Sequence, residues 1–245
     1  MSDVSRETPS VPAVARRVFH IDRLPLAESY ATLLATAGVE RGLIGPREAP
    51  RLWDRHLLNS AVLADLLPHA STVVDIGSGA GLPGIVLAIR RPDLHLTLVE
   101  PLLRRTTFLS EVVAALSLSN VEVVRGRADA LHGRRRFDVV TSRAVAPLDR
   151  LLEWSMPLVD AHGALVAMKG SSVGEEVTSA RSVLARMGCA DPTVHVLGEG
   201  LLEATTIALR VAWADPTTVS LPSATAAARG RTGVRSARSK RRKNT

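Results

Sequence analysis

The sequence predicts an α/β protein with a mainly parallel, twisted sheet and helices on both faces. Two observations lead to this prediction. Short apolar or β-branched runs alternate with helical patterns through most of the 245 residues, as in parallel sheets with crossover helices. The first run, Thr72 to Ile76, leads through a glycine-rich turn into the apolar helix Ile85 to Ile89, which is the opening unit of a Rossmann-like fold.

The remaining elements follow from the spacing of apolar residues. Residues 1–24 carry no clear period, and we expect a flexible N-terminal arm there. Helical spacing at 25–39 and 47–67 predicts an N-terminal helical cap over residues 25–70, before an α/β domain at 71–214. Further strands are expected at 95–99, 121–124, 137–141, 164–168, 193–197 and 205–213, and further helices at 102–118, 147–159 and 173–187.

The turn after the first strand carries the first functional signal. Gly77, Gly79 and Gly81 alternate with other residues, and glycine allows both the sharp bend and a close approach of a ligand to the backbone. The following helix would offer unpaired N–H groups to that ligand. A plain connection within a parallel sheet would also fit this pattern. The second strand favours a nucleotide site, because it ends in Glu100, about 20 residues beyond the glycines, where an acid can bind ribose hydroxyls.

Asp75 distinguishes between two classes of nucleotide cofactor. Dinucleotide enzymes use G-x-G-x-x-G to bind a pyrophosphate, whereas this turn reads G-x-G-x-G and has an acid just before it. An acid here suits a cofactor with no phosphate and a cationic amino-acid end, which describes S-adenosyl-L-methionine. The sequence therefore favours a Rossmann-like fold of the class I methyltransferase type over a nucleotide-linked oxidoreductase.

Five charged residues fall at the predicted carboxyl ends of strands, where open α/β sheets bind ligands. They are Asp75, Glu100, Asp129, Arg143 and Lys169. The guanidinium of Arg143 can grip a carboxylate or a phosphate with two parallel bonds, which lysine cannot reproduce. Lys169 is notable because the other two lysines, Lys240 and Lys243, lie near the end of the chain. We expect Arg143 and Lys169 to act in catalysis where cofactor and substrate meet, although Lys169 also fits a solvent-facing strand exit.

Composition limits the classes of protein that remain. The one cysteine, Cys189, excludes internal disulfides and multi-cysteine metal sites, and no metal is expected. No apolar run is long enough to cross a membrane, and residues 1–10 do not resemble a secretory signal. We therefore expect a cytoplasmic protein without membrane contact. We also expect a monomer.

The net charge of +7 is concentrated at the end of the chain. Eight of the 31 basic residues lie between Arg229 and Lys243, which leaves 23 basic against 24 acidic residues elsewhere. Residues 215–245 contain few apolar side chains, and we expect a disordered basic tail. Such a tail fits a salt-dependent tether for RNA and, equally well, a solvated extension.

Three segments together resemble the glucose-inhibited division protein B family. They are the stretch from Asp75 to Gly84 (DIGSGAGLPG), the Ser142-Arg143-Ala144 triplet and Lys169-Gly170. Members of that family methylate guanine N7 in 16S ribosomal RNA of the small subunit, with S-adenosyl-L-methionine as cofactor. The resemblance implies the same function here, with the small ribosomal subunit as partner. It also implies cofactor contacts by Gly77, Leu82, Ala128, Asp129 and Arg143.

The chemistry agrees with that implication. Guanine N7 carries a free lone pair at neutral pH, so its methylation needs alignment rather than a general base. Candidate base-stacking residues are Trp53, Trp154 and Phe137, each of which also fits a core position, and His56 fits either a site or a half-buried helix face. A small-molecule methyltransferase and a non-enzymatic RNA-binding protein that uses the tail remain alternatives.

Overall fold

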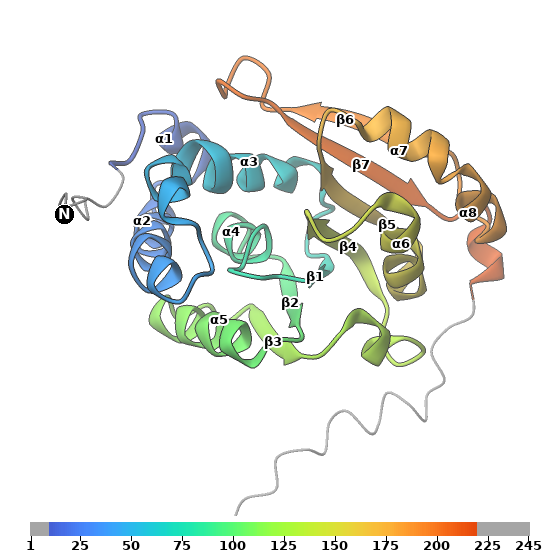
Figure 1. Ribbon diagram of the computed structural model, residues 1–245, viewed down its shortest axis with the longest axis horizontal. Coiled ribbons are helices and arrows are strands. Elements are labelled where there is room, and N and C mark those ends of the chain that lie inside the picture. Colours follow the sequence, from blue (N-terminus) through green and yellow to red (C-terminus); the bar gives the residue numbers. More distant parts are fainter. Residues whose placement is uncertain (1–9, 220–245) are drawn as a thin grey trace, which may run out of the picture.

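The sheet has the strand order that a Rossmann-like methyltransferase fold requires. The computed structural model describes residues 10–219 and contains one seven-stranded sheet in the order β3-β2-β1-β4-β5-β7-β6 (Figure 1). Neighbours among β1 to β5 pair in parallel, whereas β7 is antiparallel to both β5 and β6. The predicted α/β fold with a mainly parallel sheet is thus confirmed. The strands are β1 (Thr72–Ile76), β2 (His95–Glu100), β3 (Val121–Arg125), β4 (Phe137–Arg143), β5 (Val159–Lys169), β6 (Thr193–Leu197) and β7 (Thr206–Ala212).

Helices cover both faces of this sheet. One buried cluster joins α4, α5 and the N-terminal helices to one face, and a second cluster joins α6, α7 and α8 to the other (Figure 1). The α-helices are α1 (Ala15–Val18), α2 (Leu24–Leu33), α3 (Leu58–Ala61), α4 (Gly84–Arg90), α5 (Leu103–Ala115), α6 (Leu148–Ser155), α7 (Val173–Ser179) and α8 (Arg181–Arg186). No helix within residues 10–219 is long and apolar enough to cross a membrane.

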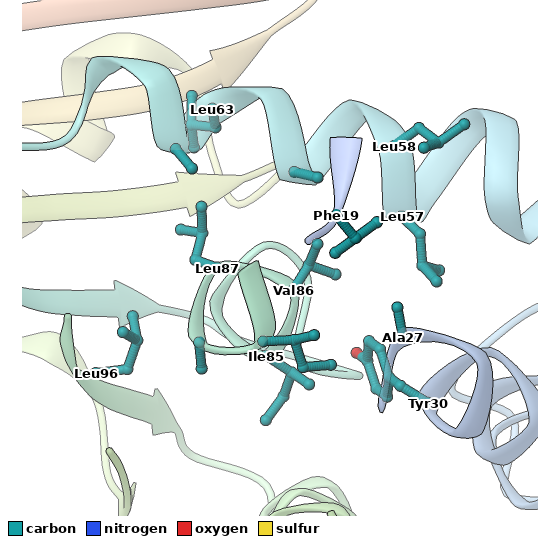
Figure 2. Close-up of a cluster of buried hydrophobic side chains, with 14 of the residues drawn as sticks. Phe19, Ala27, Tyr30, Leu57, Leu58, Leu63, Ile85, Val86, Leu87 and Leu96 are labelled. Atoms are coloured by element: carbon teal, nitrogen blue, oxygen red, sulfur yellow. The ribbon is translucent and has the colours of Figure 1, made fainter. Parts of the chain in front are cut away.

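The two helical segments expected before the first strand are present and form a cap on α4. The first is α2 extended by η1 (Leu34–Gly38), and the second runs without a break through η2 (Pro46–Arg51), η3 (Leu52–Leu57), α3 and η4 (Val62–Leu66). Figure 2 shows Ala27 and Tyr30 of α2 and Leu57 of η3 gathered around Ile85 and Val86 of α4. Full burial of one Val, Leu or Ile side chain stabilises the folded state by about 1.5–3 kcal/mol. The cap is therefore part of the main core.

The described part of the expected flexible arm contains a short helix and contributes side chains to the core. Residues 10–24 include α1, and Val18 and Phe19 are buried. The ring of Phe19 meets Trp53 edge to face at a centroid distance of 6.4 Å. A four-residue helix is too short to show a helical period, which is why the sequence pattern missed it. Residues 1–9 of the expected arm, and the expected tail from residue 220 onward, lie outside the described residues.

Several element boundaries differ from those expected, and three of the differences concern β4, β5 and the helix that follows β5. β4 continues past Thr141 because Ser142 and Arg143 still pair with β5. β5 begins five residues before Ala164, and its first pair, between Val159 and Phe137, is separated from the regular ladder by a register shift. The helix expected at 173–187 is divided at Ala180 into α7 and α8. The extension of β4 matters for function, because it makes Arg143 a strand residue rather than part of a loop.

Candidate active site

Three adjoining hollows lie beyond the carboxyl ends of the parallel strands. The first has a volume of 310 Å³, the second 660 Å³ and the third 490 Å³. The first and second hollows share Gly77, Pro101, Val145 and Trp154 as lining residues. The second and third hollows share Glu48, His56, Arg143, Ala144 and Val145. The site is therefore a row of three hollows, with Val145 common to all of them.

The glycine turn between β1 and α4 forms one wall of the second hollow. Gly79 has a φ of +59°, and a Cβ at this position would meet only the Gly77 carbonyl oxygen, at 3.8 Å. Gly81 has a φ of +99°, but a Cβ there would lie 2.6 Å from Ile85 and 2.8 Å from the Tyr30 hydroxyl. Gly79 thus leaves room for a ligand, whereas Gly81 is needed for the packing of the cap on α4. The glycine pattern in the sequence does not reveal that a side chain at position 81 would clash with the cap.

Glu100 is held in place by the backbone around it. Its Oε2 accepts a hydrogen bond from the Gly79 N–H at 3.0 Å, and its Oε1 accepts one from the Leu102 N–H at 3.0 Å. Arg105 adds an ion pair at 3.5 Å. The side chain is 1% exposed yet lines the second hollow. A carboxylate can accept about four hydrogen bonds, so Glu100 retains capacity for the hydroxyls of a bound ribose.

Asp75 lies beneath the turn instead of facing the hollows. The side chain is fully buried, and its Oδ2 accepts a hydrogen bond from the Gly84 N–H at 3.1 Å. Its Oδ1 has no partner among the described residues. Burial raises the pKa of Asp75 to about 7, against the effect of the Gly84 hydrogen bond. Asp75 does not line any of the three hollows, so its expected contact with the cofactor remains a prediction.

The other expected cofactor residues are distributed between the first two hollows. Ala128 and Asp129, in η5 (Ala128–Leu131), line the first hollow. Leu82 lines the second. Trp154 lines both and is the only one of the three candidate aromatic residues to do so, because Trp53 and Phe137 are buried in the core.

Arg143 stands at the wall between the second and third hollows and is bound by the cap. One terminal nitrogen, Nη2, contacts Nδ1 of His56, while Nε2 of His56 lies 3.0 Å from Oε2 of Glu48. Burial lowers the pKa of His56, and the nearby charge of Arg143 lowers it further. A neutral imidazole can accept from Arg143 at Nδ1 and donate to Glu48 at Nε2. The other terminal nitrogen of Arg143, Nη1, is buried without a partner among residues 10–219.

Lys169 lies in the third hollow and is not a solvent-facing strand exit. Its side chain is 8% exposed, and Nζ lies 2.7 Å from Oε2 of Glu176 and 3.4 Å from the Ala146 carbonyl oxygen. Glu176 lines the same hollow from α7. The structure therefore pairs the one lysine outside the tail with a carboxylate of the site.

Two residues of the site, Glu48 and Glu176, were not singled out from the sequence. Glu48 precedes His56 by eight residues, about two helical turns, so a shared helix face was the available signal. Glu176 pairs with a residue on another element, and no local spacing indicates that contact. Within residues 10–219, no cluster of three or more side chains is arranged to hold a metal ion.

The fold and the position of these hollows define a class I methyltransferase type of α/β protein. Solved structures with this fold include a ribosomal protein L11 methylase from Lactobacillus delbrueckii subsp. bulgaricus, with a TM-score of 0.50 and 13% identity, covering 65% of this chain and 78% of that chain. M. jannaschii TYW2, solved in complex with AdoMet, gives a TM-score of 0.50 at 15% identity, covering 62% of this chain and 72% of that one.

The chain belongs to the rRNA small subunit methyltransferase G family, which matches residues 23–204. A ribosomal RNA small subunit methyltransferase G of Nocardioides sp. is 69% identical over 228 residues, 93% of this chain and 91% of that protein. A protein of the same name from Salinispora tropica is 54% identical over 216 residues, 85% of this chain and 89% of that protein. The family membership expected from the three sequence segments is thus confirmed, and the oxidoreductase, small-molecule and non-enzymatic alternatives are set aside.

Proposed function

We propose that this protein methylates N7 of a guanine in 16S ribosomal RNA of the small subunit, with S-adenosyl-L-methionine as cofactor. The observation that carries the proposal is the shared wall at Arg143. On one side of it lies the second hollow, which is lined by Glu100 and the glycine turn, and on the other side lies the third hollow, of 490 Å³. A volume of this size falls within the range of about 300–1,000 Å³ typical of ligand sites.

The residues of the first two hollows fit the parts of this cofactor. Glu100 would accept hydrogen bonds from the ribose hydroxyls, and Ala128 and Asp129 would line the adenine position. The unpartnered Nη1 of Arg143 suits the carboxylate at the amino-acid end, because a buried guanidinium without an anion is costly. The cofactor supplies an electrophilic methyl group on a sulfonium ion.

The third hollow would hold the guanine with N7 toward Arg143. N7 needs no deprotonation, which agrees with His56 being already engaged by Arg143 and Glu48. Alignment of this kind contributes about 7–11 kcal/mol to lowering a barrier. Methylated N7 leaves a positive charge on the base. Glu48 and Glu176 line the hollow and would stabilise this charge as it develops.

The partner and the location follow from the proposed substrate. We propose the small ribosomal subunit as partner and the cytoplasm as the place of action, because ribosomal RNA is the family's substrate. The monomeric state stays a prediction, which light scattering coupled to size-exclusion chromatography tests directly.

Incubation with methyl-labelled cofactor tests the proposal. We expect label in 16S rRNA when small subunits or deproteinised 16S rRNA are supplied, and strand cleavage by aniline after borohydride treatment at one guanine, which reports N7-methylation. Replacement of that guanine by 7-deazaguanine should remove the labelling. Label that persists with 7-deazaguanine, or that appears only in ribosomal protein, would overturn the proposal.

A further inference from the structure

The third hollow has two chemically different ends. Its near end is the wall it shares with the second hollow, formed by Glu48, His56 and Arg143. Its far end contains residues that do not reach the second hollow, including the ion pair of Lys169 and Glu176. A base bound with N7 toward Arg143 would meet these residues with the edge that points away from the cofactor.

The two carboxylates in this hollow are not equally free. Both oxygens of Glu48 are engaged, Oε1 by Arg55 at 3.3 Å and Oε2 by His56 at 3.0 Å. Among the described residues, the side chain of Glu176 bonds only through Oε2, to Lys169 at 2.7 Å. Its side chain is 26% exposed, and its neighbour Lys169 is 8% exposed, so the carboxylate is anchored on one oxygen and available on the other. A carboxylate accepts about four hydrogen bonds in total, so Oε2 also keeps spare capacity.

Guanine has an edge that matches such a carboxylate. N7 and O6 are acceptors on one side of the ring, whereas N1–H and the exocyclic N2 amino group are donors on the side that faces away from N7. Two parallel N–H···O bonds to a carboxylate fit those donors. Adenine presents an unprotonated N1 at the corresponding place, which a carboxylate would repel. A base oriented with N7 toward Arg143 would thus present its donor edge to the far end.

We propose that Glu176 reads the N1–H and N2 amino groups of the target guanine and that Lys169 is a positioning residue that holds Glu176 for this contact. This inference rests on the proposed function and deepens it, because it names the residue that selects guanine. Lys169 acts through Glu176 and does not touch the reacting atoms.

The test compares guanine with inosine, which lacks the exocyclic amino group but keeps N1–H, O6 and N7. The substrates are small subunits reconstituted with 16S rRNA that carries either base at the position methylated by the wild-type protein. For the wild-type protein, we expect inosine to lower kcat/KM about tenfold, the loss of one charge-assisted hydrogen bond. For Glu176→Gln, we expect kcat/KM with guanine to fall about 10- to 100-fold and the preference for guanine over inosine to disappear.

Matched variants separate recognition from folding. Glu175 is exposed on the same helix, so Glu175→Gln should leave both the rate and the guanine preference unchanged. Lys169→Met should reduce the preference for guanine over inosine, as Glu176→Gln does. Lys169→Arg should reduce this preference less, because arginine can keep the ion pair with Glu176. Equal thermal unfolding midpoints for Glu175→Gln and Glu176→Gln would show that both variants fold.

Failure of the Glu176 assignment and failure of the proposed function would give different results. A guanine preference that is the same in Glu176→Gln and wild type would overturn the assignment of Glu176 and leave the methyltransferase proposal intact. A wild-type protein that transfers no methyl group to guanine N7 would overturn the proposed function itself, before any variant is compared.

Discussion

The proposed active site has a cofactor side and an acceptor side, and the two are built in different ways. On the cofactor side, β1, the glycine turn and the end of β2 supply Gly79 and Glu100 within 22 residues of chain, and the two are joined by a hydrogen bond. On the acceptor side, Glu48, Arg143 and Glu176 come from the cap, β4 and α7, and span more than half of the chain. The cofactor side is a local motif, whereas the acceptor side is assembled only by tertiary packing.

This difference follows from what each side must bind. A cofactor shared by many enzymes is bound by backbone N–H groups and one acid, and these are fixed by a strand–turn–helix connection. An acceptor base needs a particular set of donors and acceptors, which are supplied by whichever elements surround the third hollow. Substitutions on the cofactor side should therefore abolish binding, and substitutions on the acceptor side should change rate and selectivity.

The largest effect is expected at Gly79. Gly79→Val places a branched side chain where the turn opens into the second hollow, and we expect cofactor affinity to fall at least 100-fold by isothermal calorimetry. Gly133→Val is the matched control, because Gly133 has a similar positive φ of +68°, has nothing within 4 Å of its Cβ position and lies outside the three hollows. Equal affinity of the Gly79 variant and wild type would remove the turn from the cofactor site.

The next effect concerns Arg143, the residue shared by the two sides. Arg143→Lys keeps the charge but cannot contact His56 and a carboxylate at the same time through a planar fork. We expect kcat/KM for methylation of small subunits to fall about 100-fold, the loss of one charged interaction of up to about 3 kcal/mol. Arg181→Lys, an exposed substitution on α8, should have no effect. Near-wild-type activity of Arg143→Lys would show that the guanidinium geometry is not used.

The same contrast explains how far the sequence could predict the site. The placement of Gly77, Gly79 and Glu100 around one hollow was predictable, because a strand, a turn and the next strand fix their relative positions within one short unit. The pairing of Lys169 with Glu176 was not, because it depends on where α7 packs against the end of β5. The sheet was predictable from alternating apolar runs, whereas the start of β5 was not, because a register shift interrupts its ladder near Phe137.

A third prediction concerns Asp75, which belongs to the motif but lies beneath it. The folded pKa of about 7 exceeds the unfolded value near 3.8, so the folded state retains a proton that the unfolded state loses between these pH values. Wild-type stability should therefore fall as pH rises from 5 to 8, by roughly 3 kcal/mol more than that of Asp75→Asn, which keeps an oxygen for the Gly84 N–H. Urea unfolding without cofactor at both pH values measures this difference.

Calorimetry on the same variant tests where Asp75 acts. A residue that supports the turn from beneath should alter stability and leave cofactor affinity within a few-fold of wild type. A large loss of affinity in Asp75→Asn, with an unchanged pH dependence of unfolding, would instead place Asp75 in direct contact with the cofactor.

The smallest effect is expected from the basic tail, for which the prediction rests on composition alone. Arg229 to Lys243 carries eight cations and no acid, so by composition it should contribute phosphate contacts that lack base selectivity. Each contact with single-stranded RNA contributes about 0.7 to the slope of log affinity against log salt. Truncation at Pro222 should flatten that slope and leave the methylated guanine and the preference for guanine over inosine unchanged. Filter binding across a salt series gives the slope, and mapping of the methylated position gives the selectivity. If the truncated protein methylated a different base, selectivity would depend on the tail as well as on the third hollow, and the assignment of selectivity to the acceptor side would need revision.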